Sequence, residues 1–290
     1  MSVDANVVRR VGFAVVAIPV ALLLVWYGGA PLALLLAIAA FLGTRELFEL
    51  AVRRDVRPLR ALGLTSAAAL PPLVYAILAA PDHSAWVSGW WPYLVAIWLI
   101  LLLSAALVVR SPADRPLSAA SVTLLAVVYT GALPAFLLAI RHSNYSLRSW
   151  AGAWLVFFPL VVTWVCDTAA MFGGRALGGP KLVPSVSPGK TRSGSTAGVL
   201  GGLLVAPMFA AGIFPRVGIA IPLWQLLVVA GVLSVVGQIG DLAESLFKRE
   251  AGVKDSSNLI PGHGGVLDRL DSLYFVLPTA AALYHAFGVI

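Results

Sequence analysis

The apolar run GIAIPLWQLLVVAGVLSVVGQIGDLAE, residues 218–244, decides the fold. It is long enough to cross a hydrocarbon core of about 30 Å, for which about 20 helical residues suffice. The charged segment SLFKREAGVKDSSNLIPGHGGVLDRLDS, residues 245–272, follows it directly. Over all 290 residues only 11% are charged and the mean hydropathy is +0.92, whereas a soluble domain keeps about a quarter of its residues charged. The sequence therefore predicts an integral membrane protein.

Eight further apolar runs have a comparable length. They lie near residues 11–27, 31–50, 61–80, 92–109, 117–140, 151–172, 196–214 and 271–290. Because the runs are continuously apolar and do not alternate as barrel strands do, we expect an all-α, polytopic fold with about nine transmembrane helices. We divide the chain into N-terminal helices at 1–150 (spans 1–5) and a C-terminal catalytic region at 151–290 (spans 6–9), with polar loops at 173–195 and 245–270.

The basic residues of the loops predict the orientation. With a cytoplasmic N-terminus, sixteen Lys and Arg residues fall on the cytoplasmic side and only Arg141, Arg148 and Arg216 on the other, as the positive-inside rule requires. The net charge of +7 then belongs to one face, where it attracts anionic lipid headgroups or nucleotides more readily than nucleic acid. The single cysteine, Cys166, excludes an intrachain disulfide and a cysteine metal cage.

Two carboxylates at the end of the 218–244 run and two more after the glycine-rich turn PGHGG, residues 261–265, form a candidate metal site. Residues three or four apart share one side of a helix, and this relation holds for Gln238, Asp241, Ser245 and Lys248, with Glu244 beside them. Mg²⁺ prefers one or two carboxylates together with substrate phosphate oxygens and water. We expect the first-choice ligands to be Asp241 and Asp268, and the next to be Glu244 and Asp271.

Each carboxylate also has a structural alternative, an ion pair with Lys248, Arg249 or Arg269, which stays open above all for Glu244 and Asp271. His263 lies between glycines and is interpreted as a hydrogen-bonding or turn residue, because no second histidine or cysteine lies at ligand spacing. At the end of an earlier run, Arg45, Glu46 and Glu49 are interpreted as a charged helix end at the membrane interface, with headgroup or nucleotide binding as the alternative.

A second polar segment, DTAAMFGGRALGGPKLVPSVSPGKTRSGS, covers residues 167–195. Asp167 lies at the end of an apolar run, where a carboxylate is costly, and it either pairs with Arg175 or contacts a ligand. The closely spaced glycines, hydroxyls and cations that follow are what a polyphosphate requires. The spacing is not that of a Walker loop.

Together the two segments resemble the phosphatidate cytidylyltransferase family, the CDP-diacylglycerol synthases. The family signature is matched at Ser245, Lys248, Arg249, Lys254, Asp255, Pro261, His263, Gly264, Gly265, Asp268, Arg269 and Asp271. Upstream it is matched at Asp167, Thr168, Gly174, Arg175, Lys181, Leu182, Pro184, Ser187, Pro188, Lys190 and Thr191. The chain departs from the family pattern at Met171, Gly179 and Ser193.

The resemblance implies that CTP and phosphatidic acid give CDP-diacylglycerol and pyrophosphate in phospholipid biosynthesis. It implies catalytic roles for Asp241, Asp268, Lys248, Arg249 and Lys190. It implies substrate contacts for Asp167, Arg175, Lys181, Ser187, Arg192, Ser245, His263, Gly264, Gly265 and Arg269. Expected cofactors are Mg²⁺ and a second cation such as K⁺. The expected partners are CTP, phosphatidic acid and membrane lipids, without nucleic acid, and a homodimer is left open.

The compact length favours a bacterial inner membrane, with the active site facing the cytoplasm. One alternative function is an ion-coupled transporter with Asp167, Asp241 and Glu244 along its path, although these charges gather at one face. A CDP-alcohol phosphotransferase is a second alternative, but its aspartate-rich motif is absent. A catalytically silent relative is the third.

Overall fold

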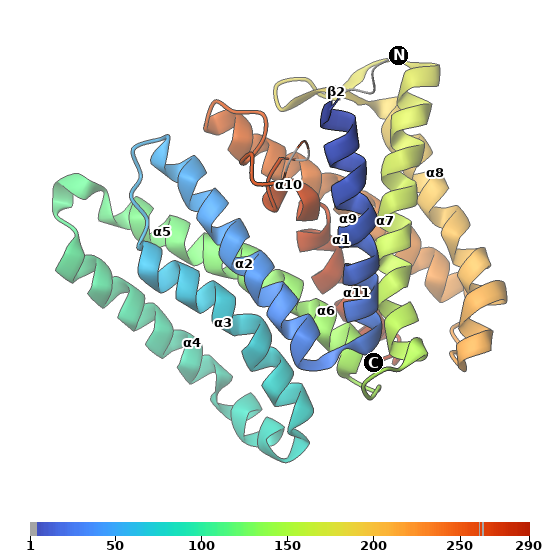
Figure 1. The fold of residues 1–290 in the computed structure, drawn as a ribbon, viewed down its shortest axis with the longest axis horizontal. Helices are drawn as coiled ribbons and strands as arrows, with labels where there is room; N and C mark the ends of the chain where they lie inside the picture. The colour runs from blue at the N-terminus through green and yellow to red at the C-terminus, as the bar shows by residue number, and fades with distance from the viewer. Residues whose placement is uncertain (1–4, 261, 263) are drawn as a thin grey trace. The chain divides into compact units, whose positions relative to one another are not determined.

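The computed structural model describes residues 5–260, 262 and 264–290, and it is mostly α-helical (Figure 1). Within this described part, seven helical segments are long and apolar enough to cross a membrane. They are Gly29–Val52, Arg60–Ala79, Gly89–Val109, Pro116–His142, Trp150–Leu177, Arg192–Val217 and Leu223–Glu250. The prediction of a polytopic, all-α membrane protein is confirmed.

The first and last predicted spans are also helices. The first lies in α1 (Ala5–Tyr27), whose described apolar part is Val15–Tyr27. The last forms α11 (Leu273–Ala286), which has 14 residues and therefore a length of about 21 Å. It is shorter than the predicted run 271–290, because Asp271 and Ser272 form a turn and residues 287–290 lie beyond the end of the helix. The short helix α10 (Leu267–Leu270) precedes this turn.

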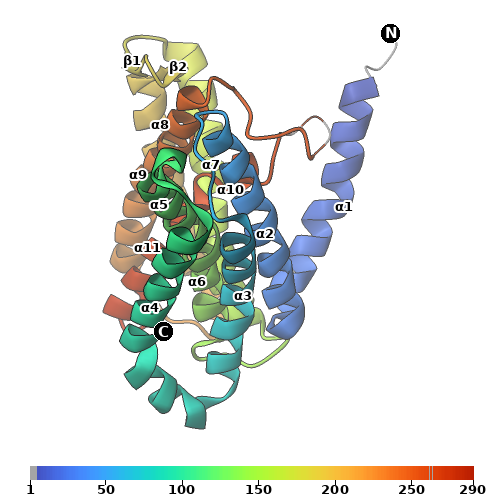
Figure 2. The same ribbon diagram turned by 90° about the vertical axis from the view of Figure 1, so that its left-hand side faces the viewer.

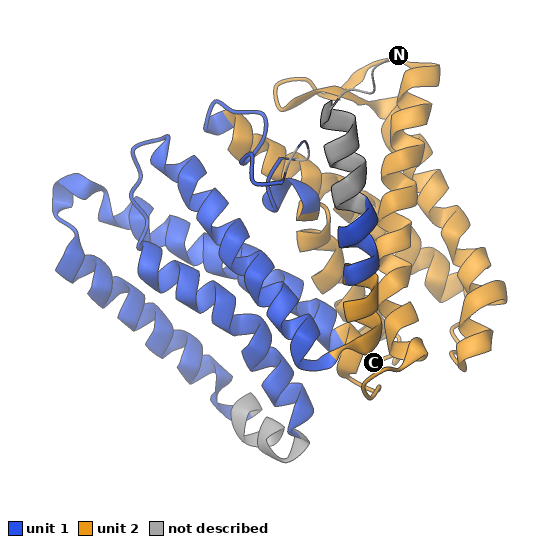
Figure 3. Cartoon of the chain, viewed as in Figure 1, with its two compact units in different colours: residues 1–20, 29–139, 250–269 blue, residues 21–28, 140–249, 270–290 orange. Residues whose placement is uncertain are grey.

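The chain forms two compact units (Figure 3). Unit 1 contains Met1–Val20, Gly29–Ala139 and Glu250–Arg269, and unit 2 contains Ala21–Gly28, Ile140–Arg249 and Leu270–Ile290. The charged segment that follows α9 (Leu223–Glu250) is thus shared between the units. The division at residue 150 separates N-terminal helices from a catalytic region, and it stays a prediction.

In unit 1, α2 (Gly29–Val52), α3 (Arg60–Ala79) and α4 (Pro81–Val109) lie side by side (Figure 1). The turn η1 (Pro112–Asp114) leads to α5 (Pro116–Ala126), and the π-helical turn η2 (Val127–Ala132) joins α5 to α6 (Leu133–His142). This irregular turn ends at Ala132, shortly before Pro134. Proline lacks the N–H that a regular helix needs, which accounts for a distortion at this place. Thr130 Oγ1 lies 2.6 Å from Thr44 Oγ1, which joins η2 to α2 in the apolar interior.

In unit 2, α7 (Trp150–Leu177) and α8 (Arg192–Met208) pack closely, because glycines recur along α8. A Cβ atom would lie 2.7 Å from the Ala170 carbonyl oxygen at Gly194, and 3.0 Å from the Cys166 carbonyl oxygen at Gly198. Small residues at this spacing let membrane helices approach each other. The turns η3 (Phe209–Ile213) and η4 (Phe214–Val217) then lead to α9.

A β-hairpin stands between α7 and α8, where the sequence predicts only a polar loop (Figure 2). Strand β1 (Lys181–Val183) pairs in antiparallel fashion with β2 (Ser187–Thr191), with Lys181 opposite Thr191. Thr191 also caps α8, because its Oγ1 accepts a hydrogen bond of 3.1 Å from the Gly194 N–H. Lys190, one residue before this cap, is thereby held close to the start of a helix.

Candidate active site

The last turns of α9 carry the predicted polar residues of unit 2. Lys190 Nζ from β2 lies 2.6 Å from Asp241 Oδ2 on α9, and both side chains are only partly exposed. The structure thus brings together one cation and one carboxylate that the sequence assigns to two different segments. Ser245, one turn further along α9, donates a longer hydrogen bond of 3.4 Å to Asp241 Oδ1.

Three more hydrogen bonds hold the hairpin and the start of α8 along α9. Ser195 Oγ donates to Gln238 Oε1 at 2.5 Å, and Gln238 Nε2 donates to the Ser195 carbonyl oxygen at 3.3 Å. Further along, Arg249 Nε donates to the Val186 carbonyl oxygen at 3.1 Å. Because contacts lie on both sides of the Lys190–Asp241 pair, the position of Lys190 is fixed by the hairpin as a whole.

Asp271 joins this group of charges from the turn before α11. Gly240 permits the approach, since a Cβ atom there would lie 2.8 Å from the Asp271 carbonyl oxygen. Burial, together with the negative charge of Asp241, raises the pKa of Asp271 to about 7, and Asp167 adds a smaller increase. Asp167, Asp241 and Asp271 are therefore close enough to repel one another.

This crowding of carboxylates is what a bound cation relieves. Among the described residues, no group of three or more His, Cys, Asp and Glu side chains forms a ready metal cage. Mg²⁺ needs only one or two protein carboxylates when substrate oxygens and water complete its shell. Asp241 and Asp271, which come from neighbouring segments and share an unfavourable negative potential, fit this requirement.

Glu244 has a different environment from Asp241. It is fully buried, and its Oε1 lies 3.2 Å from Lys248 Nζ one turn along α9. This is the ion pair that the sequence leaves open as the alternative role of Glu244. Its charge is compensated within α9, so Glu244 is less available to a metal than Asp241 or Asp271.

Asp268 belongs to unit 1, where its carboxylate organises the loop before α10. Its Oδ2 accepts hydrogen bonds of 2.8 Å from the Ser256 N–H, the Ser256 hydroxyl and the Gly265 N–H. Gly264 has a φ of +80°, and a Cβ atom there would lie 2.6 Å from the same oxygen. A metal shared by Asp241 and Asp268 stays a prediction, since the two residues belong to different units.

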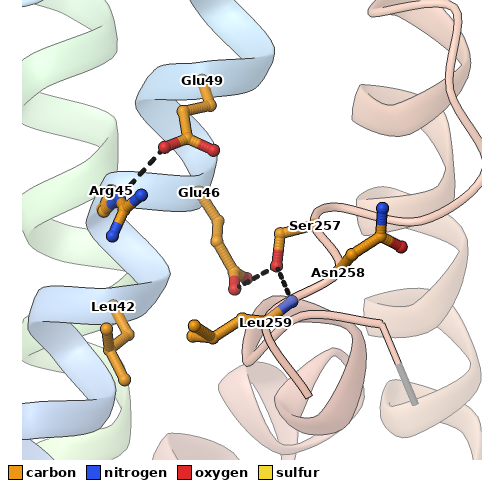
Figure 4. Close-up of a pocket in the computed structure, with 7 residues that line it drawn as sticks. All are labelled: Leu42, Arg45, Glu46, Glu49, Ser257, Asn258 and Leu259. Atoms are coloured by element: carbon orange, nitrogen blue, oxygen red, sulfur yellow. Dashed lines mark hydrogen bonds and ion pairs between the residues drawn. The ribbon is translucent and has the colours of Figure 1, made fainter. Parts of the chain in front are cut away.

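Glu46 is the residue that the sequence interpretation missed. Only 2% of it is exposed, so it is not a solvated helix end. Its Oε2 accepts from the Ser256 hydroxyl at 2.9 Å and the Leu267 N–H at 2.9 Å. Its Oε1 accepts from the Ser257 hydroxyl at 2.7 Å (Figure 4). The same oxygen accepts from the Val266 N–H at 3.0 Å. The sequence contains one signal of this role. A carboxylate within or near a membrane span is costly, so Glu46 requires hydrogen-bond donors or a cation as partners.

The charged neighbours of Glu46 on α2 are exposed, and their predicted place at the membrane interface stays a prediction. Arg45 Nε lies 3.0 Å from Glu49 Oε1 one turn away, and both side chains are exposed. With Glu46 and the Ser257–Leu259 segment, they line a pocket of about 210 Å³ (Figure 4).

The other predicted site residues are distributed along the polar segments. Five of the cations have exposed side chains, namely Arg175, Lys181, Arg192, Arg249 and Arg269. Ser187 is half-buried in β2. In the described part of the chain, no ion pair joins Asp167 to Arg175. His263 lies outside the described residues.

Known proteins resemble the chain over nearly its whole length. A model of the cytidylyltransferase family matches residues 8–287. The phosphatidate cytidylyltransferase of Staphylococcus saprophyticus is 36% identical over 266 residues, which cover 91% of this chain and 94% of the relative. That of Brucella suis is 52% identical over 143 residues, and that of Bacillus subtilis 41% identical over 154 residues. These two alignments span about half of each chain, 48% of both for Brucella suis, and 53% of this chain and 54% of the relative for Bacillus subtilis.

Proposed function

The chain belongs to the cytidylyltransferase family, and from this premise we propose that it transfers the cytidylyl group of CTP to phosphatidic acid. The products are CDP-diacylglycerol, for phospholipid biosynthesis, and pyrophosphate. The observation that supports the proposal is the 2.6 Å pair of Lys190 and Asp241, the latter in the C-terminal half of a helix long enough to cross a membrane. In the proposal, Lys190 binds phosphate and Asp241 binds a metal. A lipid that stays in the bilayer and a soluble polyanion can meet only near the end of such a helix.

In the proposed reaction, a phosphate oxygen of phosphatidic acid attacks the α-phosphorus of CTP. A new P–O bond forms, the bond to the bridging oxygen breaks, and pyrophosphate leaves with the electron pair. No side chain acts as a nucleophile. Because two anions must approach each other, the protein contributes mainly by aligning them and offsetting their charge.

Mg²⁺ is part of this proposal, because it offsets the charge of phosphate oxygens and orients them when it is bound. Asp241 and Asp268 are its first-choice ligands, and Glu244 and Asp271 the next. The raised pKa of Asp271 supports a role for Asp271, whereas the pairing of Glu244 with Lys248 argues against Glu244. A second cation such as K⁺ is the other proposed cofactor.

Lys190 and Asp241 have separate tasks once substrate is present. In the structure each neutralises the other. When the nucleotide binds, Lys190 turns its ammonium to a phosphate group, and the Asp241 carboxylate becomes available to the cation. The exposed cations Arg175, Lys181, Arg192, Arg249 and Arg269 then receive the remaining negative charge of the triphosphate and of the lipid phosphate.

We place the site at the cytoplasmic face of a bacterial inner membrane. The support is the excess of Lys and Arg in the loops that carry these residues, since such loops stay in the cytoplasm. CTP and phosphatidic acid are the proposed substrates, and a homodimer stays a prediction from the sequence.

The test is a reaction of the purified protein with phosphatidic acid, Mg²⁺ and CTP radiolabelled at the α-phosphate. We expect label in the organic phase, dependent on phosphatidic acid, stopped by EDTA and restored by Mg²⁺. Asp241→Asn should lower the rate by about 100-fold or more while the protein still folds. An absence of CTP-dependent lipid product, together with solute uptake into vesicles that contain the protein, would instead identify a transporter.

A further inference from the structure

A groove of about 270 Å³ in unit 2 has no role in the reaction as described so far. Its lining residues are Leu182, Val183, Ser195, Val235, Gln238, Ile239 and Leu242. Its walls come from the elements that carry the Lys190–Asp241 pair. Leu242 follows Asp241 on α9, and Val183 pairs with Ser187 of the strand that contains Lys190. The groove is therefore attached to the candidate active site by both of its walls.

The walls of the groove are apolar except at one place. Five of the seven lining residues are aliphatic and none is charged. The two polar ones, Ser195 and Gln238, are joined by the 2.5 Å hydrogen bond. A triphosphate or a free phosphate ion finds no cation here, and a cytosine ring finds no aromatic side chain on which to stack. The groove is suited to an aliphatic ligand that also carries a polar group.

The open side of the groove belongs to a membrane helix. Val235 and Ile239 are 47% and 49% exposed on α9, and they continue an exposed apolar stripe that includes Val228 and Val232. Since α9 is long and apolar enough to cross a membrane, this stripe faces lipid hydrocarbon. An acyl chain can thus enter the groove sideways without leaving an apolar environment.

We propose that this groove binds the ester-proximal acyl segment of phosphatidic acid, with Ser195 and Gln238 facing its ester groups. This inference rests on the proposed function and identifies where the lipid lies relative to Lys190. Its volume is below the range of about 300–1,000 Å³ that is typical of pockets for whole small ligands, so it holds one segment of one chain. The rest of the lipid stays in the bilayer.

Filling the groove tests the proposal. Ile239→Trp places a large ring between the walls, and Val235→Trp is a second variant in case the first folds poorly. Val228→Trp is the matched control, because Val228 is 42% exposed on the same stripe of α9 but does not line the groove. KM is measured separately for dioleoyl phosphatidic acid in mixed micelles and for CTP, alongside the thermal unfolding temperature.

We expect Ile239→Trp to raise the KM for phosphatidic acid by about tenfold, as overpacking a filled pocket does. The KM for CTP should change by less than about twofold, and Val228→Trp should change neither constant. An unchanged KM for phosphatidic acid in both groove variants, or an equal rise for the control, overturns the proposal while the proposed function stands. A rise in the KM for CTP alone would assign the groove to the nucleotide, and it would also overturn the proposal that the groove binds the lipid.

A second arm needs no turnover and therefore separates the two proposals. Phosphatidic acid with a diazirine beside the acyl ester is photolysed in vesicles that contain the wild-type protein. We expect label on the peptide with Ile239 and Leu242, and its loss in Ile239→Trp. Equal labelling of the exposed Leu204 on α8 (73% exposed) would show unspecific lipid contact and refute the groove. A wild-type protein that forms no lipid product refutes the proposed function, and the labelling then decides on the groove alone.

Discussion

Glu46 and Asp268 meet at the hydroxyl of Ser256, whose Oγ lies 2.9 Å from Glu46 Oε2 and 2.8 Å from Asp268 Oδ2. One hydroxyl hydrogen serves only one carboxylate at a time. Both buried carboxylates therefore also accept hydrogen bonds from backbone N–H groups. The donors to Glu46 are Val266 and Leu267, and the donors to Asp268 are Ser256 and Gly265. Within unit 1, α2 thereby fixes the segment from Gly265 to Asp268.

Replacing Glu46 should disturb that segment. In Glu46→Gln an amide group points its own hydrogens at the N–H of Val266 or Leu267, so a buried donor loses its acceptor. We expect a loss of about 1–3 kcal/mol in the free energy of unfolding and a fall in kcat of about tenfold or more. Denaturation and turnover of the purified variant measure the two effects.

Glu49→Gln is the matched control for this change. Glu49 lies one turn further along α2, and its exposed side chain pairs with Arg45. An exposed pair contributes about 0–1 kcal/mol, so stability and turnover should stay close to the wild type. If both glutamines behave alike, the hydrogen bonds of Glu46 do not have the role assigned to them.

Gly265 should not tolerate even a methyl group. A Cβ atom at this position would overlap the Ser256 hydroxyl and the Glu46 carboxylate. Gly265→Ala should therefore cost about 1–3 kcal/mol of stability, seen as a lower unfolding temperature. Gly212→Ala serves as the control, because a Cβ atom at Gly212 meets no atom within 4 Å. A Gly265→Ala protein as stable as the control would contradict the packing described.

The Lys190–Asp241 pair predicts a loss of turnover when its cation is removed. Lys190→Met should lower kcat/KM for CTP by about 100-fold, since the positive charge beside the phosphate site disappears. Arg53→Met, which removes one exposed cation of unit 1, should leave the rate within about twofold. Steady-state kinetics with CTP as the varied substrate compares the two variants, and equal rates would exclude Lys190 from the site.

Asp271 predicts that the protein without a bound cation becomes less stable as the pH rises. Its pKa of about 7 in the folded protein lies above the value of about 4 for an unfolded chain. The folded state thus binds the proton more tightly, and its contribution to stability is full below about pH 4 and is lost as the pH rises through about 7. In EDTA, the unfolding temperature of the wild type should therefore fall over this range.

Asp271→Asn tests the effects of this charge and of a bound cation. At pH 8 without a divalent cation the variant should unfold at a higher temperature than the wild type, because a buried, repelled charge is gone. Added Mg²⁺ should stabilise the wild type, and the variant much less. Equal stabilisation of both proteins by Mg²⁺ would remove Asp271 from the set of ligands.

The sequence predicted well what depends on local properties of the chain. Apolar runs such as 151–172 and 218–244 became α7 and α9, because crossing a membrane requires an unbroken apolar helix. The polar face of α9 from Gln238 to Lys248 also follows from helical spacing alone.

Features that depend on distant contacts could not be predicted in this way. The partners of Glu46 lie more than 200 residues away in sequence, at Ser256, Ser257, Val266 and Leu267. The sequence predicts a loop at the β1–β2 hairpin, because both strands are short and β2 contains a proline and a glycine. Residues Glu250–Arg269 continue the chain from α9 but pack in unit 1, which no local pattern indicates.

If Lys190 binds the nucleotide and Asp241 the metal, as proposed, the contact between their side chains makes the two binding events depend on each other. An anion without a metal ion that attracts Lys190 leaves the negative charge of Asp241 without its partner. A cation without a nucleotide that attracts Asp241 leaves the positive charge of Lys190 without its partner. A nucleotide that arrives with its own divalent ion satisfies both groups in the same event. Binding of the two should therefore be cooperative, and ordinary cellular phosphate should be a poor competitor at the resting protein.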